Sequence, residues 1–110
     1  MLRKYLFVAL MMLGAAAWAA GDSAGDVLVY KLATCGCCAK WVAHMRDHGF
    51  SVTEVEVEDV TPYKRKHGIP AELSSCHTAL VGDYVIEGHV PAADVKRLLE
   101  EKPPLAGLAV

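Results

Sequence analysis

Apolar runs and helically spaced apolar positions follow one another along the first half of the chain. A nearly continuous apolar run over Asp26–Leu32 predicts a strand that is buried on both faces. Apolar residues at helical spacing from Cys38 onward predict a helix, which Gly49 can end in the left-handed conformation. The β-branched stretch Phe50–Val57 predicts a second strand. The first half is therefore expected to fold as strand, helix, strand.

The middle of the chain has shorter segments and clear turn signals. Thr61-Pro62 predicts the N-cap and first position of a short helix, which Gly68 closes. Further on, Thr78–Val81 and Tyr84–Glu87 flank Gly82-Asp83, a two-residue connection suited to a tight hairpin. These segments predict one short helix followed by two antiparallel strands.

The C-terminal part predicts one more helix and a tail. Pro91 can open a helix whose apolar positions keep helical spacing until Pro103-Pro104 stop it. Residues 103–110 have no periodicity, so we expect an unstructured tail there. One domain over residues 26–102 is the expectation.

The predicted order is β-α-β-α-β-β-α, an α/β fold with a four-stranded mixed sheet, as in small thioredoxin-like domains. In that topology the end of the first strand, the start of the third and the end of the fourth share one edge of the sheet. Sulfur and imidazole groups from three segments should meet at this edge, namely Cys35, Cys37, Cys38, Cys76, His77 and His89.

The N-terminus indicates export. Arg3 and Lys4 precede an apolar stretch and the small residues around Ala17-Trp18-Ala19, a pattern typical of a cleaved signal peptide over residues 1–19. A short linker over 20–25 would follow. No cysteine stands at the cleavage site, so a lipid anchor is not expected. The mature protein should be soluble and periplasmic, in an oxidising compartment where four cysteines need a reason.

Charge argues against a nucleic-acid partner. Removal of 19 of the 110 residues takes two of the 11 basic residues, which leaves nine against 13 acidic ones and a net charge of −4. The run Lys64-Arg65-Lys66 is then most simply a solvated helix face.

Three of the four cysteines stand within four positions, at Cys35, Cys37 and Cys38, directly after the first strand. Cys35 and Cys38 form a C-x-x-C pair on the first turn of the predicted helix, where thiol pKa values are lowered. Packing alone rarely places three thiols within four positions. A disulfide between neighbouring Cys37 and Cys38 would be strained, whereas Cys35 and Cys38 can close a disulfide without strain. The cluster therefore predicts chemistry.

Metal binding is the chemistry that the thiols favour. Thiolates are soft ligands that prefer Cu(I), and several thiolates around one point can bridge more than one Cu(I) ion. Zinc is the competitor, but C-x-C-C with a distant cysteine is a less natural tetrahedral set.

The histidines differ as candidates. His77, beside Cys76, is the best candidate for a ligand or a ligand-supporting group, and His89 is open between a ligand and a turn residue. His44 and His48 are four residues apart on the predicted first helix, a spacing that can hold a metal but more often marks a solvated face. We treat His48 and His67 as surface residues.

The segments TCGCCAKW (residues 34–41), SCHTALV (75–81) and EGHVPA (87–92) together resemble the CopG-type family of exported copper-resistance proteins. The resemblance implies a periplasmic copper-binding protein of thioredoxin-like fold that is tied to copper tolerance and has a redox role on copper. It implies Cys35, Cys37, Cys38 and Cys76 as ligands, and His44 recurs in the family pattern. Family members often continue with a methionine-rich tail, so no ligand from such a tail is expected here.

Two classes of function remain open. The first is a copper-binding protein that acts as a buffer, a sequestering agent or a Cu(I)/Cu(II) redox partner. Its expected partners are copper ions and a periplasmic copper chaperone or efflux system. The second is a periplasmic thiol-disulfide oxidoreductase that uses Cys35 and Cys38. A third sulfur at Cys37, and Cys76 where such enzymes keep a cis-proline, favour the metal. Whether copper is turned over as a redox substrate is not decided by the sequence.

Overall fold

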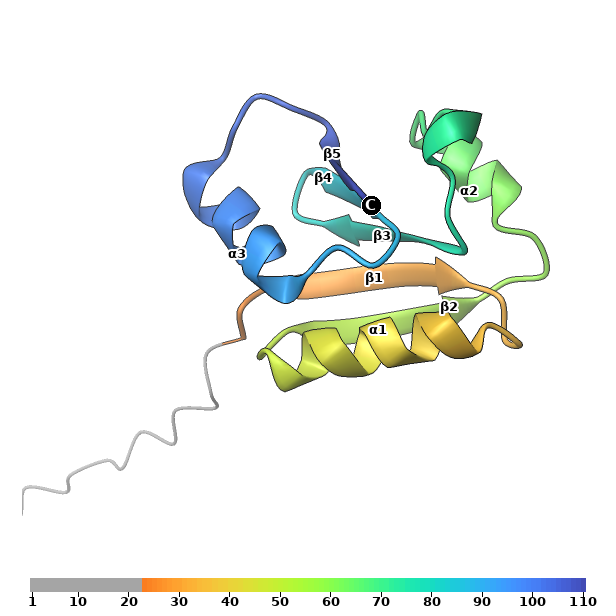
Figure 1. The fold of residues 1–110 in the computed structure, drawn as a ribbon, viewed down its shortest axis with the longest axis horizontal. Helices are drawn as coiled ribbons and strands as arrows, with labels where there is room; N and C mark the ends of the chain where they lie inside the picture. Colours follow the sequence, from red (N-terminus) through yellow and green to blue (C-terminus); the bar gives the residue numbers. More distant parts are fainter. Residues whose placement is uncertain (1–22) are drawn as a thin grey trace, which may run out of the picture.

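The computed structural model describes residues 23–110, so the predicted signal peptide and the start of the predicted linker lie outside the described residues. The elements follow the predicted order, with one further strand added (Figure 1). The sequence also predicts a short turn beginning at Ile69-Pro70, and a short 3₁₀ helix (η1) follows Pro70 in the structure. In chain order they are β1 (Asp26–Lys31), α1 (Gly36–Asp47), β2 (Ser51–Glu56), α2 (Thr61–Lys66), η1 (Ala71–Leu73), β3 (His77–Val81), β4 (Tyr84–Glu87), α3 (Ala92–Glu101) and β5 (Gly107–Ala109).

The strands form one mixed sheet in the order β2-β1-β3-β4-β5. As predicted, β1 and β2 are parallel, β3 is antiparallel to β1, and β3 and β4 form a hairpin. The prediction of four strands was wrong, because β5 adds a fifth strand parallel to β4. Its three residues come from the segment that was expected to be an unstructured tail. So short a strand leaves no periodicity in the sequence, and its position depends on the exposed edge of β4.

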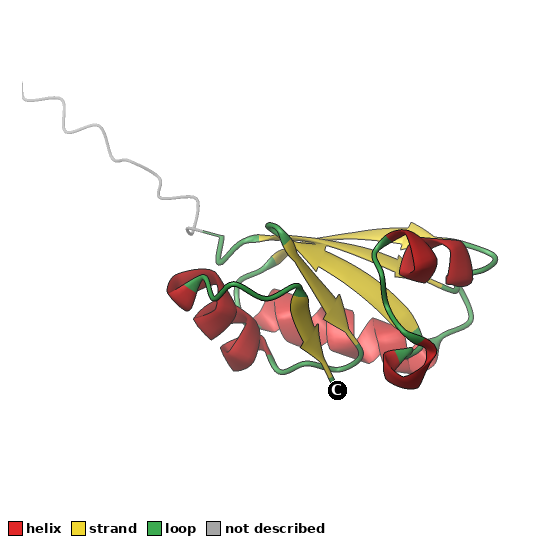
Figure 2. Ribbon diagram, turned by 90° about the horizontal axis from the view of Figure 1, so that it is seen from above, coloured by secondary structure: helices red, strands yellow, loops and turns green. Residues whose placement is uncertain are grey.

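The two faces of the sheet are covered by different helices (Figure 2). Val27 and Val29 of β1 lie in one buried core with the apolar faces of α1 and α3. Tyr30 points to the other face, where its ring stacks on Tyr63 of α2 at 4.1 Å between centroids. Burial alternates along β1, so the expectation of burial on both faces holds only in part.

Helix α1 presents a buried stripe of Trp41, Val42 and Met45 to the sheet, as its spacing predicts. It begins at Gly36, earlier than the apolar stripe suggests. The N-cap of helix α2 is Val60, so Thr61 is its first residue and not the predicted N-cap. The Asp59 carboxylate accepts a hydrogen bond from the Thr61 N–H at 2.9 Å. That backbone hydrogen bond lowers the pKa of Asp59. Within residues 23–110, none of the helices combines the length and apolar character needed to cross a membrane.

Candidate metal centre

Helix α1 carries three of the four sulfurs on its first turn. Cys35 is the N-cap, and its Sγ accepts a hydrogen bond from the Cys38 N–H at 3.4 Å. Cys38 turns inward and is fully buried, Cys35 is half-buried, and Cys37 is exposed. One helical turn therefore spreads three sulfurs from the core to the surface.

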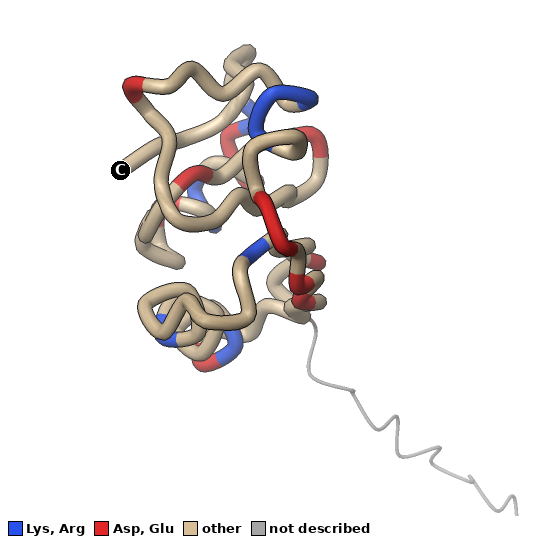
Figure 3. Tube along the Cα trace, turned by 90° about the vertical axis from the view of Figure 1, so that its right-hand side faces the viewer, with Lys and Arg blue, Asp and Glu red and all other residues tan. Residues whose placement is uncertain are grey.

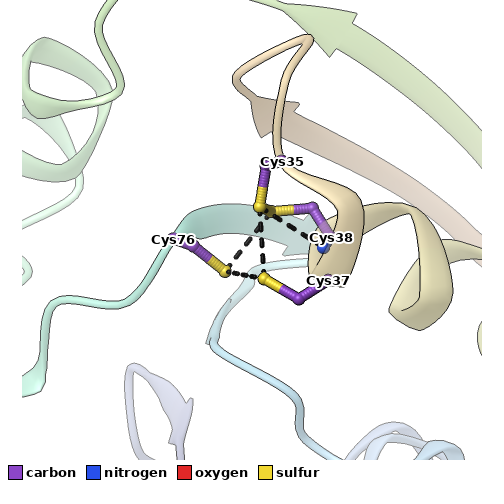
Figure 4. Close-up of side chains that lie close together, drawn as sticks. All are labelled: Cys35, Cys37, Cys38 and Cys76. Carbon is purple, nitrogen blue, oxygen red and sulfur yellow. Dashed lines mark hydrogen bonds between the residues drawn. A yellow bond between two sulfur atoms is a disulfide. The ribbon is translucent and has the colours of Figure 1, made fainter.

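The fourth sulfur comes from a distant segment. Cys76 immediately precedes β3, whose antiparallel pairing with β1 sets Lys31 opposite His77. The Cys76 Sγ lies 3.3 Å from the Cys38 Sγ and 3.4 Å from the Cys37 Sγ, and the Cys37 and Cys35 sulfurs are 3.3 Å apart (Figure 4). All four sulfurs lie within 4.8 Å of one another. The predicted convergence at one edge of the sheet is confirmed.

Two of these cysteines are joined and two are free. Cys35 and Cys38 form a disulfide, whereas Cys37 and Cys76 are thiols. The structure therefore shows the form of the centre that holds one disulfide, and two electrons with two protons convert it to the form with four thiols. Burial raises the pKa of the Cys76 thiol, and its hydrogen bond with Cys37 raises it further. A metal ion at this point has to displace that proton.

His77 is completely buried beside Cys76. Its Nε2 lies 3.0 Å from the Gly88 carbonyl oxygen, which can only accept, so we assign the ring proton to Nε2. The unprotonated Nδ1 then lies 3.6 Å from the Cys76 Sγ. Burial, and next the neighbouring His89, lowers the pKa of His77 from 6.5 to about 4. At neutral pH His77 therefore offers a free nitrogen lone pair beside the sulfur cluster.

Aromatic stacking fixes the orientation of this imidazole. The ring of His77 stacks on buried Trp41 of α1, with 4.6 Å between centroids. The Trp41 Nε1–H donates to the Val90 carbonyl at 2.8 Å. The ring of exposed His89 also stacks on His77, with 5.6 Å between centroids. The nitrogens of His77 and His89 and the sulfur of Cys76 form a second group that could hold a metal.

His44 lies apart from both groups. Its Nε2 accepts a hydrogen bond from the Ala92 N–H, at the first residue of α3, at 3.0 Å. The Nδ1 of exposed His48 is 2.8 Å from the His44 carbonyl oxygen, and the two rings are tilted against each other. The hydrogen bond to Ala92 joins α1 to α3. His44 belongs to neither group that could hold a metal, so no contact with the sulfurs supports its predicted role as a ligand.

Sequence reasoning missed a buried ion pair beneath Cys76. Lys64 was expected on a solvated face within the three consecutive cations of α2, which form a continuous blue segment in Figure 3. Instead its ammonium is buried against the carboxylate of Glu87. A glutamate at the end of an otherwise apolar strand was the one available signal. No periodicity could have named its partner on a short helix.

Comparison with known proteins adds an independent finding. Residues 73–110 match the family described as "Protein of unknown function, DUF411". Two solved structures, both titled copper resistance protein copG, are 40% identical to this chain, with TM-scores of 0.74 and 0.73. Each alignment covers 78% of this chain and 68% of the other. No curated protein matches.

Proposed function

This chain belongs to the family of the copper resistance protein CopG, and from that membership and its sulfur cluster we propose that it binds Cu(I) and serves copper resistance in the periplasm. The observation that carries the proposal is the meeting of four sulfurs from two distant segments within 4.8 Å. The proposed ligands are Cys35, Cys37, Cys38 and Cys76.

The donor set favours copper over zinc. After reduction of the disulfide, four thiolates surround one point, and soft thiolates select Cu(I). Their mutual closeness suits bridging, in which one sulfur serves two metal ions, so the centre can be multinuclear. Zinc prefers four separate donors at the corners of a tetrahedron, which a Cys37-Cys38 neighbour pair supplies poorly.

The histidines give the proposal a redox side. The Nδ1 of His77 faces the sulfur of Cys76, and exposed His89 is the third member of the same candidate ligand group. Imidazole is a harder donor than thiolate and stabilises Cu(II) relative to an all-sulfur set. In this redox role, two thiolates give one electron each to two Cu(II) ions, which yields two Cu(I) ions and the Cys35–Cys38 disulfide. Copper is then a substrate as well as a cargo.

Partners and location complete the proposal. The signal-like N-terminus supports export to the periplasm, where copper would be exchanged with a copper chaperone or an efflux system. The β-α-β-α-β-β-α order followed by a short β5 supports a thioredoxin-like fold for the domain.

One observation favours a second candidate, a thiol-disulfide oxidoreductase. The C-x-x-C pair Cys35 and Cys38 forms a disulfide at a helix N-terminus, and Cys35 is half-buried, so a substrate thiol can reach it. Such an enzyme has no need of Cys37 or Cys76, yet both sulfurs contact the pair.

The test is an anaerobic Cu(I) titration of the reduced protein against a competing chelator. Cys76→Ser should bind less copper and bind it more weakly, because the one sulfur that β3's side contributes to the cluster is gone. His67→Gln, outside both candidate groups, is the matched control and should equal wild type. Equal stoichiometry and affinity in Cys76→Ser would refute the four-sulfur centre.

A further inference from the structure

A buried ion pair contacts the backbone at the start of β3. Lys64 of α2 and Glu87 at the end of β4 are only 7% and 3% exposed at their side chains. Taking two such charges out of water is costly, and their mutual attraction often does no more than offset that cost. Apolar side chains of similar size would usually give equal or greater stability. The presence of this pair therefore needs a reason other than stability.

The contacts of the pair supply that reason, because they hold both neighbours of Cys76. The Ser75 N–H donates to the Glu87 carboxylate at 2.7 Å, and the Lys64 ammonium donates to the His77 carbonyl at 3.2 Å. Thr78 closes the network: its hydroxyl donates to Glu87 at 2.8 Å and accepts from Lys64 at 3.0 Å. The backbone is thus fixed immediately before and after the metal-binding candidate.

A second feature of this corner points the same way. Gly88, which follows Glu87, has a φ of +80°, and a Cβ there would collide with the Val110 backbone oxygen and press on the Ser75 side chain at 3.2 Å. Its carbonyl accepts the hydrogen bond from the Nε2 of His77. Glu87 and Gly88, at the end of β4, therefore fix both the position of Ser75 and the orientation of the His77 ring.

We infer that Lys64 and Glu87 are positioning residues, which hold Cys76 at sulfur-contact distance from Cys37 and Cys38. The inference rests on the proposed copper-binding function for its purpose, but not for its geometry. Neither side chain touches a sulfur. The pair acts through the backbone on either side of Cys76, so its loss should loosen the sulfur cluster even where the fold is kept.

The decisive variant removes the whole network and leaves apolar packing in its place: Lys64→Met, Thr78→Val and Glu87→Leu together. No buried charge or hydroxyl is left unpaired, so this triple variant should stay folded. It should melt below wild type, because the Ser75 N–H loses its acceptor. A milder variant, Lys64→Met with Glu87→Gln, keeps an oxygen for the Ser75 N–H and releases the hydrogen bonds that Lys64 donates to His77 and Thr78. Val95→Ala, in the buried face of α3, is the control that lowers stability without touching the network.

The first readout needs no copper. In protein oxidised to the Cys35–Cys38 form, Cys37 and Cys76 are the free thiols, and their sulfurs lie 3.4 Å apart. Dibromobimane, which becomes fluorescent when it joins two nearby thiols, should cross-link them readily in wild type and in Val95→Ala. Cross-linking should slow in the milder variant and slow further in the triple variant.

The second readout is Cu(I) affinity of the reduced proteins by chelator competition. The triple variant should lose about 10–100-fold, the range seen when groups that orient a metal ligand are removed. Cross-linking and affinity equal to wild type in a folded triple variant would overturn the inference. If the triple variant does not fold, the same equality in the milder variant overturns it. If wild type binds no Cu(I), the proposed function fails, and cross-linking still decides whether the pair positions Cys76.

Discussion

The two segments that bring sulfur to the centre are built in opposite ways. The turn at the start of α1 is local: Cys35, Cys37 and Cys38 are set by one helical turn, and Cys35 caps the helix itself. The start of β3 is set from a distance, by Lys64 on α2 and Glu87 on β4. A local motif needs only its own helix, whereas a distant ligand needs a buried network to hold it.

Their surroundings differ as well. The α1 turn lies at a helix N-terminus, where the backbone dipole favours negative charge on a sulfur, and it exposes Cys37 to solvent. On the β3 side, burial raises the pKa of Cys76 and lowers that of His77. The β3 side therefore favours the neutral forms of Cys76 and His77, whereas the α1 side presents an exposed thiol beside a disulfide. The proposed metal centre therefore does not hold four thiolates while the metal is absent.

The largest effect should follow from breaking the α1 side at Cys37. Cys37→Ser should lower Cu(I) affinity by at least about a hundredfold, since loss of a ligand exceeds the loss of a group that orients one. The melting temperature should change little, because Cys37 is exposed. Chelator competition measures the affinity.

The same variant separates the two candidate functions. A thiol-disulfide enzyme uses only Cys35 and Cys38, so its insulin-reductase activity would survive Cys37→Ser. Strong reductase activity in wild type and variant, together with unchanged copper binding, would favour the enzyme over the metal centre.

The next largest effect concerns Trp41, the residue that joins the two sides. Its indole stacks on His77 and donates to the Val90 carbonyl from a fully packed position. Trp41→Ala should reduce the free energy of unfolding by about 3–5 kcal/mol, as large aromatic truncations in cores do. Urea denaturation measures this loss, and Trp41→Phe, which keeps an aromatic ring at the position, is the comparison variant. A loss below about 1 kcal/mol would mean that the two sides are held independently.

A pH effect should arise on the β3 side alone. The pKa of His77 is about 4 in the folded protein against 6.5 ordinarily, so between these values the unfolded chain binds a proton that the native chain does not. The free energy of unfolding should therefore fall as pH drops from 6.5 toward 4. His77→Gln should flatten that fall in denaturation curves of the metal-free protein. An equally steep fall in His77→Gln would show that other groups cause it.

The smallest effect should come from His44, which lies on α1 but outside the cluster. His44→Ala should cost about 1 kcal/mol, comparable to the loss of a helix cap, because the Ala92 N–H loses its acceptor. Cu(I) affinity should match that of wild type. A clear drop in affinity, measured beside His48→Ala, would instead make His44 a ligand.

Local patterns in the sequence predicted most of the fold. The apolar periods of α1 and α3, the two-residue hairpin turn and the parallel pair β1 and β2 all follow from residues close together in the chain. The meeting of Cys76 with the α1 thiols followed from strand order alone, because antiparallel pairing sets which ends share an edge. The motif and the edge were enough to propose the metal centre.

Tertiary structure alone decided the rest. It showed that β5 pairs with the edge of β4 and that Lys64, expected on a solvated face, is buried against Glu87. It further showed that His44 accepts a hydrogen bond from the first residue of α3 and does not contact the sulfurs. It also showed which nitrogen of His77 faces Cys76. A periodic pattern records only which face of an element is apolar. Which polar group meets which depends on how elements distant in the chain pack, since a buried charge is tolerated only where the fold supplies its partner.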